Sequence, residues 1–417
     1  MSVRIAIIGA GPVGLTLARL LHNLTKRNLE VVVFESEPSR YARQQGGTLD
    51  LHPDTGLAAI KEAGLWDEFK KHVRYDGEAL IICDKKLVKY ISLTAKDETS
   101  SAGRPEIDRS SLREMLLDSV PPEMIRWGCH LREIDENRNL IFDHGIESGF
   151  DLVVGADGAW SKIRRYLSDQ KPDYSGISGY IFHIPNAKET APAAYKLTNR
   201  GSVFSFSDGR SIMSQYISDG SLYINAWCQL PENWREILPH DVNDTEAIKK
   251  LVLEQFHDWH PDLVNFIKSA EQPSSASLYM LPVGWRWDHR PGVTLIGDAA
   301  HLMTPFAGEG VNVGMQDALM LSRAVGKALD SPNPAVQLNP ELVDFEEDLF
   351  VRAERTTSLT KDMMHWMMFA DGSPRTVIDK YILRILTFHD KGILDYLRYP
   401  LLMASLKSWF FLYRLWH

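Results

Sequence analysis

The chain has 417 residues, which is long enough for two or three domains and for a sizeable buried site. Hydrophobic residues make up 44% of the chain and charged residues 24%, a composition that excludes a disordered or fibrous protein. Acidic residues outnumber basic ones by 55 to 46, and the net charge of −9 argues against a nucleic-acid partner held by phosphate contacts.

The cysteine and histidine patterns argue against disulfides and metal sites. Cys83, Cys129 and Cys228 are too few and too widely spaced for a disulfide framework, and the histidines lack metal-ligand spacing. We therefore expect free thiols, no metal and a reducing, cytoplasmic location. The N-terminus lacks the basic start and apolar stretch of a signal peptide, and no apolar run reaches about 18 residues, so we expect no spanning membrane segment.

The first 35 residues predict a parallel βαβ unit. Val3 to Ile8 is an aliphatic run apart from Arg4, and the glycines after it precede an apolar-periodic stretch up to Leu21. Leu29 to Phe34 is again apolar apart from Glu30 and is rich in valine. Strands of this composition are buried on both faces of a sheet. The pattern predicts an α/β fold with a doubly wound sheet.

Two later segments repeat the pattern of an aliphatic strand that stops at small residues. They are DLVVGADG, which starts at Asp151, and VTLIGDAA, which starts at Val293. Because the carboxyl ends of parallel strands meet at one edge of a sheet, all three strand ends could converge on one ligand.

The segment between Ser175 and Ser277 has a different pattern. Short stretches alternate apolar and polar residues, and Asp-Gly pairs follow them at 208–209 and 219–220, which predicts an antiparallel sheet with one face covered. Beyond Pro340 the chain becomes helical. We expect a discontinuous Rossmann-like domain at 1–170 and 282–335, an inserted substrate-binding sheet domain at 171–281, and C-terminal helices at 336–417.

The first glycine turn has the sequence of a dinucleotide-binding fingerprint. Gly9 permits the tight turn, Gly11 lets a pyrophosphate approach the backbone, and Gly14 lets helix and strand pack closely. Glu35 ends the second predicted strand, where a carboxylate accepts hydrogen bonds from ribose hydroxyls. This motif predicts an adenosine-containing ligand, and it does not separate FAD from NAD.

The third strand end favours a flavin. Asp298 can accept a hydrogen bond from a polyol chain, and a helix follows from about Val311 through Leu321. A helix N-terminus directed at a ring stabilises negative charge on it, and a reduced flavin carries such charge whereas nicotinamide does not. The candidate residues of this turn are Pro305, Gly308, Gly310 and Asn312.

At this point the chain resembles the group A FAD-dependent aromatic monooxygenases related to para-hydroxybenzoate hydroxylase. The resemblance rests on three blocks in order, Gly9–Gly14, Asp157–Arg164 and Gly297–Asp317. Three further stretches are similar to the tetracycline-inactivating branch: GGTLDLH from Gly46, EIDRSSLREML from Glu106 and IGDAAHLMTPFAGEGVN from Ile296.

The resemblance implies roles for several side chains. Arg113 would contact the flavin diphosphate region, Arg43 would lie near the isoalloxazine and the entering nicotinamide, and Asp298 would hold the ribitol and pyrophosphate side. Asp157 would lie near both flavin and nicotinamide. Surface roles remain open for the two arginines.

The resemblance also implies the reaction. NADPH or NADH reduces FAD, O2 forms a C4a-hydroperoxide, and one oxygen atom passes to an electron-rich carbon of an aromatic or enolic small molecule. No catalytic side chain is required, because the flavin does the chemistry. The substrate segment lacks a clear cationic cluster, which favours a neutral, polycyclic substrate such as a natural product or a tetracycline-like antibiotic. The alternatives are a flavin-dependent halogenase and a non-catalytic, redox-responsive FAD-binding protein.

Other features have both a functional and a structural interpretation. His301 could be a general base, but packing beside the flavin motif is favoured, and Trp285 with Trp287 resembles a halogenase motif that continues differently here. The candidates for a substrate pocket are Pro305, Phe306, Met364, Met367 and Met368, with helix core as the alternative for the methionines.

The apolar segment Leu401–His417 has three open interpretations. It can be a core helix, a dimer contact or an interfacial helix on a membrane surface, since Lys407 and Arg414 make a crossing unfavourable. Core packing is the commonest fate of such a stretch, and we favour it.

Overall fold

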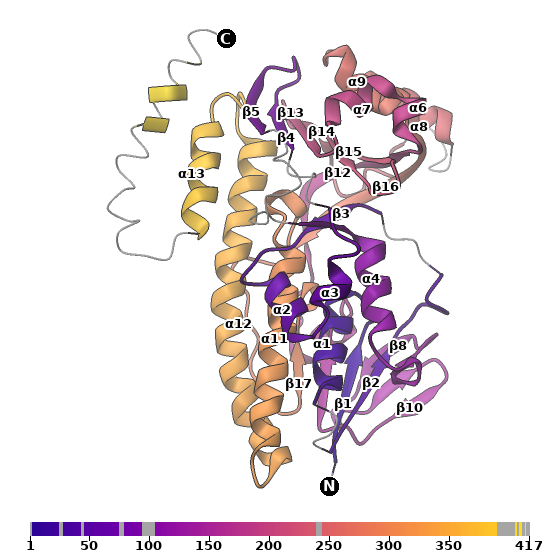
Figure 1. Ribbon diagram of the computed structural model, residues 1–417, viewed down its shortest axis with the longest axis vertical. Helices are drawn as coiled ribbons and strands as arrows, with labels where there is room; N and C mark the ends of the chain where they lie inside the picture. The colour runs from indigo at the N-terminus through magenta and orange to yellow at the C-terminus, as the bar shows by residue number, and fades with distance from the viewer. Residues whose placement is uncertain are drawn as a thin grey trace. The chain divides into compact units, whose positions relative to one another are not determined.

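The computed structural model describes residues 2–24, 28–42, 46–74, 79–93, 105–238, 244–389, 405–406, 408–410 and 413 (Figure 1). The chain forms two compact units. Unit 1 comprises Met1–Arg74, Arg104–Asp173 and Tyr279–Ser358, and unit 2 comprises Tyr75–Gly103, Tyr174–Leu278 and Leu359–His417. The predicted α/β architecture with a discontinuous first unit is confirmed, and the functional domain limits at 170, 281 and 335 stay a prediction.

Unit 1 is built on a five-stranded sheet in which all neighbouring strands run parallel. Its strands, in spatial order, are β17 (Val293–Leu295), β11 (Leu152–Gly155), β1 (Val3–Ile8), β2 (Leu29–Phe34) and β7 (Ile125–Arg126). The register aligns Ile8 with both Gly155 and Phe34, so neighbouring strands end together. The three strand ends that the sequence singled out therefore lie side by side at one edge, as predicted.

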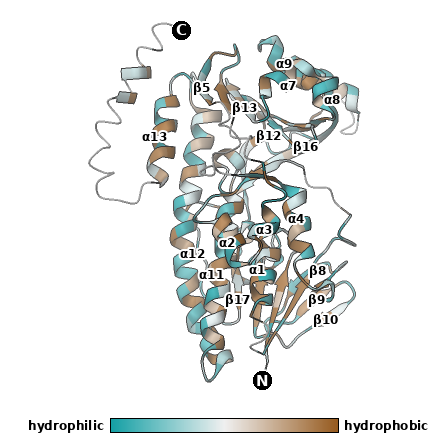
Figure 2. Ribbon diagram, viewed as in Figure 1, coloured by the Kyte–Doolittle hydropathy of each residue, from teal (hydrophilic) through white to brown (hydrophobic). Residues whose placement is uncertain are grey.

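Burial on both faces explains the aliphatic composition of these strands (Figure 2). Ile5 and Ile7 of β1 are fully buried although they point to the opposite side of the sheet from Ala6, which is buried as well. Each such isoleucine contributes roughly 1.5–3 kcal/mol through burial. The sheet is covered in part by α1 (Pro12–His22), which packs against α11 (Gly310–Leu329). The long helix predicted near Val311 thus begins one residue earlier and runs farther than expected.

Smaller elements complete unit 1. The helices are α2 (Gly56–Glu62), α3 (Trp66–Phe69), α4 (Arg109–Asp118), η3 (Pro122–Met124), α5 (Lys162–Leu167), α10 (Asp298–His301) and η4 (Pro305–Ala307). The strands β3 (Thr48–Asp50) and β6 (Glu106–Asp108) form a two-stranded sheet. The strands β8 (Leu131–Ile134), β9 (Leu140–Phe142) and β10 (Gly145–Glu147) form a three-stranded antiparallel sheet.

Unit 2 is built on a seven-stranded sheet. Its strands, in spatial order, are β16 (Glu271–Met280), β12 (Asp173–Ile184), β15 (Leu222–Gln229), β14 (Arg210–Tyr216), β13 (Ser202–Ser207), β4 (Leu80–Cys83) and β5 (Lys89–Leu93). The predicted antiparallel sheet is confirmed, with the Asp208-Gly209 turn joining β13 and β14. Two features differ from expectation. The strands β4 and β5 come from residues 80–93, and β13 pairs with β4 in parallel.

One face of this sheet is covered by short helices, as the alternating pattern predicted. Residues of even number on β15, such as Ile224 and Ala226, point into a core with Phe256 and Phe266. The helices of this layer are α6 (Ala187–Thr190), α7 (Pro192–Thr198), α8 (Thr245–Gln255) and α9 (Pro261–Lys268).

The C-terminal part is helical. The helix α12 (Pro334–Met364) begins before Pro340, where the sequence predicted helix to start, and a π-helical segment η5 (His365–Phe369) and α13 (Ile378–His389) follow. The helices α11 and α12 lie side by side in Figure 1, and an ion pair of 2.6 Å joins Arg352 to Asp317. Within the described residues, no helix is both long and apolar enough to cross a membrane.

Candidate cofactor site and substrate face

The turn between β1 and α1 has the geometry of a phosphate-binding loop. Gly9 has a φ of +108°, and a Cβ on Gly14 would lie 2.1 Å from the Gly9 carbonyl oxygen, so both positions require glycine. A Cβ on Gly11 would meet nothing within 4 Å. Since Gly11 caps the N-terminus of α1, free backbone N–H groups of the first helical turn border an open space, as a pyrophosphate requires.

Glu35 is fixed beside this turn. Its carboxylate accepts hydrogen bonds from the backbone N–H of Ala10 at 2.6 Å, from that of Glu37 at 2.9 Å and from the Ser36 hydroxyl at 3.0 Å. A carboxylate has about four acceptor positions, so one remains for a ribose hydroxyl. The side chain predicted to bind ribose is thus held rigidly at the end of β2.

Asp157 follows the adjacent strand β11 and caps α5. Its Oδ2 accepts the backbone N–H of Lys162 at 2.7 Å, whereas its buried Oδ1 has no hydrogen-bond partner among the described residues. Burial raises the pKa of this carboxyl despite its hydrogen bonds. A buried acceptor without a donor has a strong tendency to bind one, so Oδ1 fits a ligand that supplies an N–H or O–H group.

Arg164 joins the second motif to the third. Its guanidinium donates to the carbonyl oxygens of Ala299 at 3.0 Å and Asp298 at 3.4 Å, and it is buried. Burial lowers the pKa of Arg164. Arg164 belongs to the second motif, but no local pattern in the sequence predicts partners 135 residues away.

Asp298 stands at the end of β17 with an exposed side chain. Desolvation by the surrounding chain raises the pKa of its carboxyl, although the nearby charges of His301, Arg109 and Arg164 act in the opposite direction. Its carboxylate makes no side-chain hydrogen bond within the described part of the chain. An accessible carboxylate without a side-chain hydrogen bond, placed just after a strand, can accept a hydrogen bond from a polyol hydroxyl.

The turn after Asp298 leads into α11. Gly308 has a φ of +70° and Gly310 begins the helix, while Asn312 is fully buried and accepts the backbone N–H of His52 at 2.8 Å. His301 contacts Asp317 at 2.6 Å, deep inside the unit. This burial supports the structural interpretation of His301.

A buried histidine that no sequence motif predicted, His52, lies against the same turn. His52 Nε2 is 3.0 Å from Asp50 Oδ2, and His52 Nδ1 is 3.3 Å from Glu309 Oε2. Burial alone would lower the pKa of His52, but its hydrogen bonds to Asp50 and Glu309 outweigh burial and raise it to about 9. His52 is therefore a cation at neutral pH.

Of the two arginines to which the resemblance assigned flavin contacts, the structure describes Arg113 and not Arg43. Arg113 is buried on α4 and donates to Glu37 Oε2 at 2.8 Å and to the Arg40 carbonyl at 2.9 Å. It thus holds the segment that follows Glu35. Arg43 lies outside the described residues.

Taken together, the residues of unit 1 fit FAD. Gly11 borders an open space at a helix N-terminus, Asp298 is accessible and unsatisfied, and Asp157 has an orphaned buried oxygen. All three belong to the neighbouring strand ends of β1, β17 and β11. No group of three or more metal-ligating side chains gathers in the described ranges.

Unit 2 has a sheet face that the short helices do not cover. Its half-buried side chains alternate with the core residues along four strands, and the strand register places His183 beside Tyr223 and Asn225 beside Met213. The members of this face, called the polar sheet face, are Ile181, His183, Phe204, Met213, Gln215, Tyr223 and Asn225. It mixes aromatic and neutral polar groups without a lysine or arginine, a composition suited to an uncharged ring system.

The residues predicted to line a substrate pocket fall in both units. In unit 1, Pro305 is exposed and Phe306 is buried. In unit 2, Met364, Met367 and Met368 are buried at the end of α12 and in η5, and the Gln229 amide donates to the Met368 carbonyl. Their role as pocket lining stays a prediction.

The tryptophan pair is a packing feature. Trp287 stacks edge-on against Phe350 with centroids 4.6 Å apart, and its indole N–H donates to Glu346 Oε1 at 3.3 Å. Trp285 lies 5.4 Å from Trp287. These contacts support the structural interpretation of the pair.

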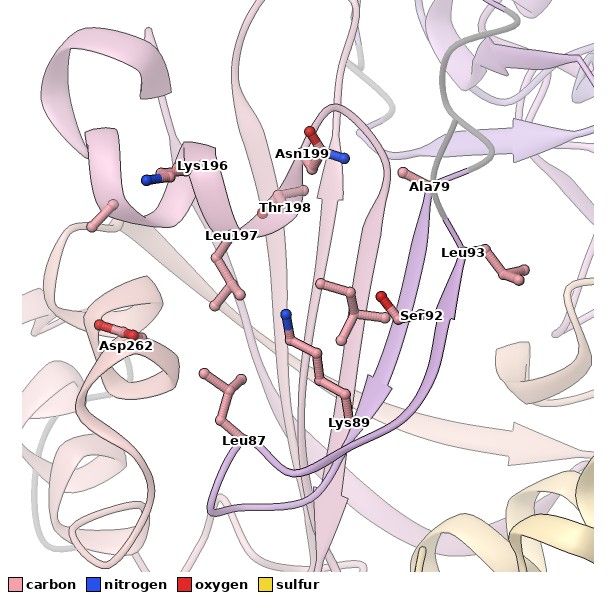
Figure 3. A pocket seen from close by; sticks show the side chains of 12 residues that line it. Ala79, Leu87, Lys89, Ser92, Leu93, Lys196, Leu197, Thr198, Asn199 and Asp262 are labelled. Carbon is pink, nitrogen blue, oxygen red and sulfur yellow. The ribbon is translucent and has the colours of Figure 1, made fainter. Parts of the chain in front are cut away.

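A separate hollow of about 560 Å³ lies in unit 2 between β4, β5 and α7 (Figure 3). Ile81 and Leu197 supply apolar walls, and Lys89 and Lys196 contribute the cationic groups. Ile81 also packs against the helix-covered core, so this hollow belongs to the other side of the sheet from the polar sheet face.

Comparison with known proteins agrees with this geometry. A family model described as an FAD binding domain matches residues 2–119 and 146–334. The monooxygenase penA of Penicillium thymicola is 31% identical, over 86% of this chain and 93% of its own length.

Two solved structures share the fold. One is a salicylate hydroxylase substrate complex (TM-score 0.74, 17% identity, covering 97% of this chain and 98% of that one). The other is the tetracycline destructase Tet(51) (TM-score 0.64, 18% identity, covering 93% and 96%). The chain thus belongs to the FAD-binding-domain family, and it is an FAD-dependent enzyme of the aromatic monooxygenase type.

Proposed function

We propose that this protein uses NADPH or NADH and O2 to hydroxylate a neutral, electron-rich aromatic or enolic small molecule, with a polycyclic ring system as the preferred class. The observation that carries the proposal is the set of three adjacent strand ends in unit 1. Each end presents one open or unsatisfied group, at Gly11, Asp157 and Asp298. A ligand with a pyrophosphate, a polyol and a ring has the matching groups.

In this proposal the turn at Gly9–Gly14 binds the pyrophosphate, Glu35 binds the adenosine ribose and Asp298 binds the ribitol. The turn at Gly308–Gly310 and the N-terminus of α11 receive the pyrimidine edge of the ring, where backbone N–H groups stabilise negative charge. FAD supplies the redox and oxygen chemistry when it is bound. The side chains bind and orient the two ligands and exclude water.

The substrate class follows from the polar sheet face of unit 2. Tyr223 and Phe204 offer aromatic surface, and Asn225 and Gln215 offer donors and acceptors that orient hydroxyl or carbonyl groups. Because this face carries no lysine or arginine on β12 to β15, a carboxylate-bearing substrate would lack the usual cationic partner there. The neutral class is therefore favoured, and tetracycline-like molecules fall within it. The three cysteines are free and buried, which favours a reducing, cytoplasmic location.

The proposal is tested on the purified yellow protein by following NADPH and NADH oxidation with a panel of neutral polycyclic phenols, enols and their carboxylated analogues. We expect neutral members to stimulate oxidation and to gain one oxygen atom. Stimulation restricted to carboxylated analogues contradicts the substrate class, and a halogenated product in the presence of chloride supports the halogenase alternative.

A further inference from the structure

Asp298 lies in a short turn whose backbone is held at its first residue, Gly297. The backbone N–H of Gly297 donates to Asp317 Oδ2, on α11, at 3.0 Å. The Gly297 carbonyl oxygen accepts the backbone N–H groups of Ala300 at 2.8 Å and His301 at 2.9 Å. Hydrogen bonds therefore fix both main-chain polar groups of the residue that precedes Asp298.

Gly297 has a backbone conformation that other residues rarely adopt, with a φ of +61° and a ψ of −143°. A Cβ at Gly297 would lie 3.2 Å from the Val13 side chain, and a Cβ at Gly314 would lie 2.7 Å from the same valine. Both positions therefore favour glycine. Because glycine has access to many other backbone conformations, the hydrogen bond from its N–H to Asp317 selects this one.

Asp317 is a fully buried carboxylate that serves three donors. Besides the N–H of Gly297, His301 Nε2 lies 2.6 Å from Oδ2, and Arg352 Nη1 donates to Oδ1 at 2.6 Å. Burial alone would raise the pKa of Asp317, but the charges and hydrogen bonds of His301 and Arg352 outweigh burial and lower it. A carboxylate has about four acceptor positions, so Asp317 can satisfy all of these donors at once.

We propose that Asp317 is a positioning residue for the flavin, which holds Gly297 so that the Asp298 carboxylate is directed at the ribitol chain. Asp317 acts through Gly297, because it is itself fully buried. The inference rests on the proposed ribitol-binding role of Asp298.

A purely structural role makes a different prediction. Asp317 also joins α11 to α12 through Arg352, and loss of this buried ion pair destabilises the unit whether or not the turn moves. In that case the loss of FAD affinity should not depend on the side chain at position 298. If Asp317 acts by directing Asp298, its replacement should cost little affinity once the Asp298 carboxylate has been removed.

A double-mutant cycle separates the two roles. The dissociation constant of FAD from the apoprotein is measured by flavin fluorescence, together with the melting temperature, for Asp317→Ala, Asp298→Ala and the double variant. We expect Asp317→Ala to raise the dissociation constant about tenfold in the wild-type background and less than about twofold in the Asp298→Ala background. The melting temperature should fall equally in both backgrounds, because the contacts with His301 and Arg352 are lost in each.

Glu346→Ala is the matched control. Glu346 is also a buried carboxylate of unit 1 with three side-chain partners, namely Thr294 at 2.8 Å, Trp287 at 3.3 Å and His289 at 2.7 Å. Its replacement should lower the melting temperature as well. None of its partners among the described residues belongs to the turn Gly297–His301, so the FAD dissociation constant should stay within about twofold of the wild type.

A second variant covers the case in which Asp317→Ala does not fold. The single change leaves Arg352 as a buried cation whose remaining carboxylate partner is Asp348, at 2.7 Å. Adding Arg352→Met removes this charge and keeps the apolar part of the side chain. The resulting double variant should regain stability, and it should still bind FAD about tenfold more weakly than the wild type, because Gly297 remains unsupported.

Three results would overturn the inference: equal effects of Asp317→Ala on affinity in both backgrounds, full affinity in the variant that also carries Arg352→Met, or an equal loss of affinity in Glu346→Ala. Asp298→Ala alone tests the proposed function. Unchanged FAD affinity in Asp298→Ala contradicts the proposed ribitol site itself, whereas weakened affinity together with independent effects of the two changes contradicts only the role of Asp317.

Discussion

Gly11 and Gly14 lie three positions apart in one motif, yet their surroundings differ completely. A Cβ at position 14 would overlap the Gly9 carbonyl oxygen at 2.1 Å, whereas a Cβ at position 11 would point into open space. Gly11 also has an ordinary φ of −75°, which alanine adopts readily. We therefore propose that Gly11 serves the ligand, whereas Gly14 serves the fold.

Alanine substitutions should separate these two roles. Gly14→Ala should destabilise the protein by at least about 2 kcal/mol, because the backbone of β1 and α1 must move apart. Gly11→Ala should retain the wild-type melting temperature of the apoprotein and lose FAD affinity. Thermal unfolding and FAD titration of both variants check this, and a Gly11→Ala protein with unchanged affinity would contradict the phosphate-binding assignment.

Asp298 leads to a parallel prediction. Its accessible carboxylate has no side-chain hydrogen bond among the described residues, so Asp298→Ala removes no hydrogen bond of the fold and should leave the apoprotein stable. FAD retention during gel filtration should fall. Asp67→Ala, which removes an exposed carboxylate paired with Lys70, is the control. Full retention of FAD by Asp298→Ala would exclude the ribitol role.

The raised pKa of His52 predicts a pH dependence of stability. Since the pKa rises from 6.5 to about 9 on folding, the stabilising contribution is complete below pH 6.5 and is lost as the pH rises through 9. The free energy of unfolding of the apoprotein should therefore fall across this window by on the order of 1–3 kcal/mol more in the wild type than in His52→Gln. Denaturant titrations at pH 6 and pH 9.5 measure the difference, and parallel behaviour of both proteins would refute it.

Among the elements, those with a continuous local pattern were predictable and those defined by distant partners were not. The aliphatic runs at Val3 and Leu29 and the alternating segments between Ser175 and Ser277 carry their periodicity in the sequence, and they form β1, β2 and the sheet of unit 2. The strands β4 and β5 belong to that sheet although β5 ends at Leu93 and the next strand of the sheet along the chain, β12, begins only at Asp173. Their pairing with β13 depends on topology, which no local pattern encodes.

The residues of the candidate site also divide into those that a local pattern predicted and those that depend on distant partners. The glycines, Asp157 and Asp298 were predictable because each follows an aliphatic strand. The contact of Arg164 with Ala299 and that of His52 with Glu309 join segments that meet only in three dimensions. The sequence signal for His52 was a histidine two residues after an aspartate. This pattern is common on protein surfaces and does not predict burial.

Asp157 caps α5 and also has a buried Oδ1 without a hydrogen-bond partner among the described residues, so its replacement should affect both stability and the rate of flavin reduction. Asp157→Ala should cost about 1 kcal/mol of stability through loss of the cap and remove the orphaned Oδ1 from the site. We expect anaerobic reduction of bound FAD by NADPH or NADH to slow more than FAD affinity declines. Stopped-flow reduction with Ser161→Ala, another cap of the same helix, is the comparison. Equal rates in the two variants would assign Asp157 to the fold alone.

For the molecule as a whole, the described residues at the end of the chain contact β5. Lys407, Arg414 and most of Leu401–His417 lie outside the described residues, but Phe410 is buried and the Tyr413 hydroxyl donates to the Lys89 carbonyl at 2.6 Å. Tyr413 also lies 5.8 Å from Tyr90, with ring planes inclined by 59°. These contacts join the segment to β5 within unit 2 and favour core packing over a membrane or dimer contact.

Deletion of Leu401–His417 should therefore lower the melting temperature by several degrees, because the buried Phe410 is lost and Tyr413 no longer packs against Tyr90 of β5. Differential scanning fluorimetry measures the shift, and vesicle co-sedimentation and gel filtration test the alternatives. A truncated protein with unchanged melting temperature and altered sedimentation would assign the segment to a membrane or partner.

The fate of molecular oxygen decides whether the enzyme is the monooxygenase that its geometry suggests. The FAD-loaded protein is incubated with NADPH or NADH, ¹⁸O2 and the panel of neutral polycyclic phenols and enols. The masses of the products are then measured by mass spectrometry. We predict a product that carries one ¹⁸O atom, formed with stoichiometric nicotinamide oxidation. An oxygen atom derived from water, a halogenated product, or nicotinamide oxidation that no panel compound stimulates would contradict the proposed function.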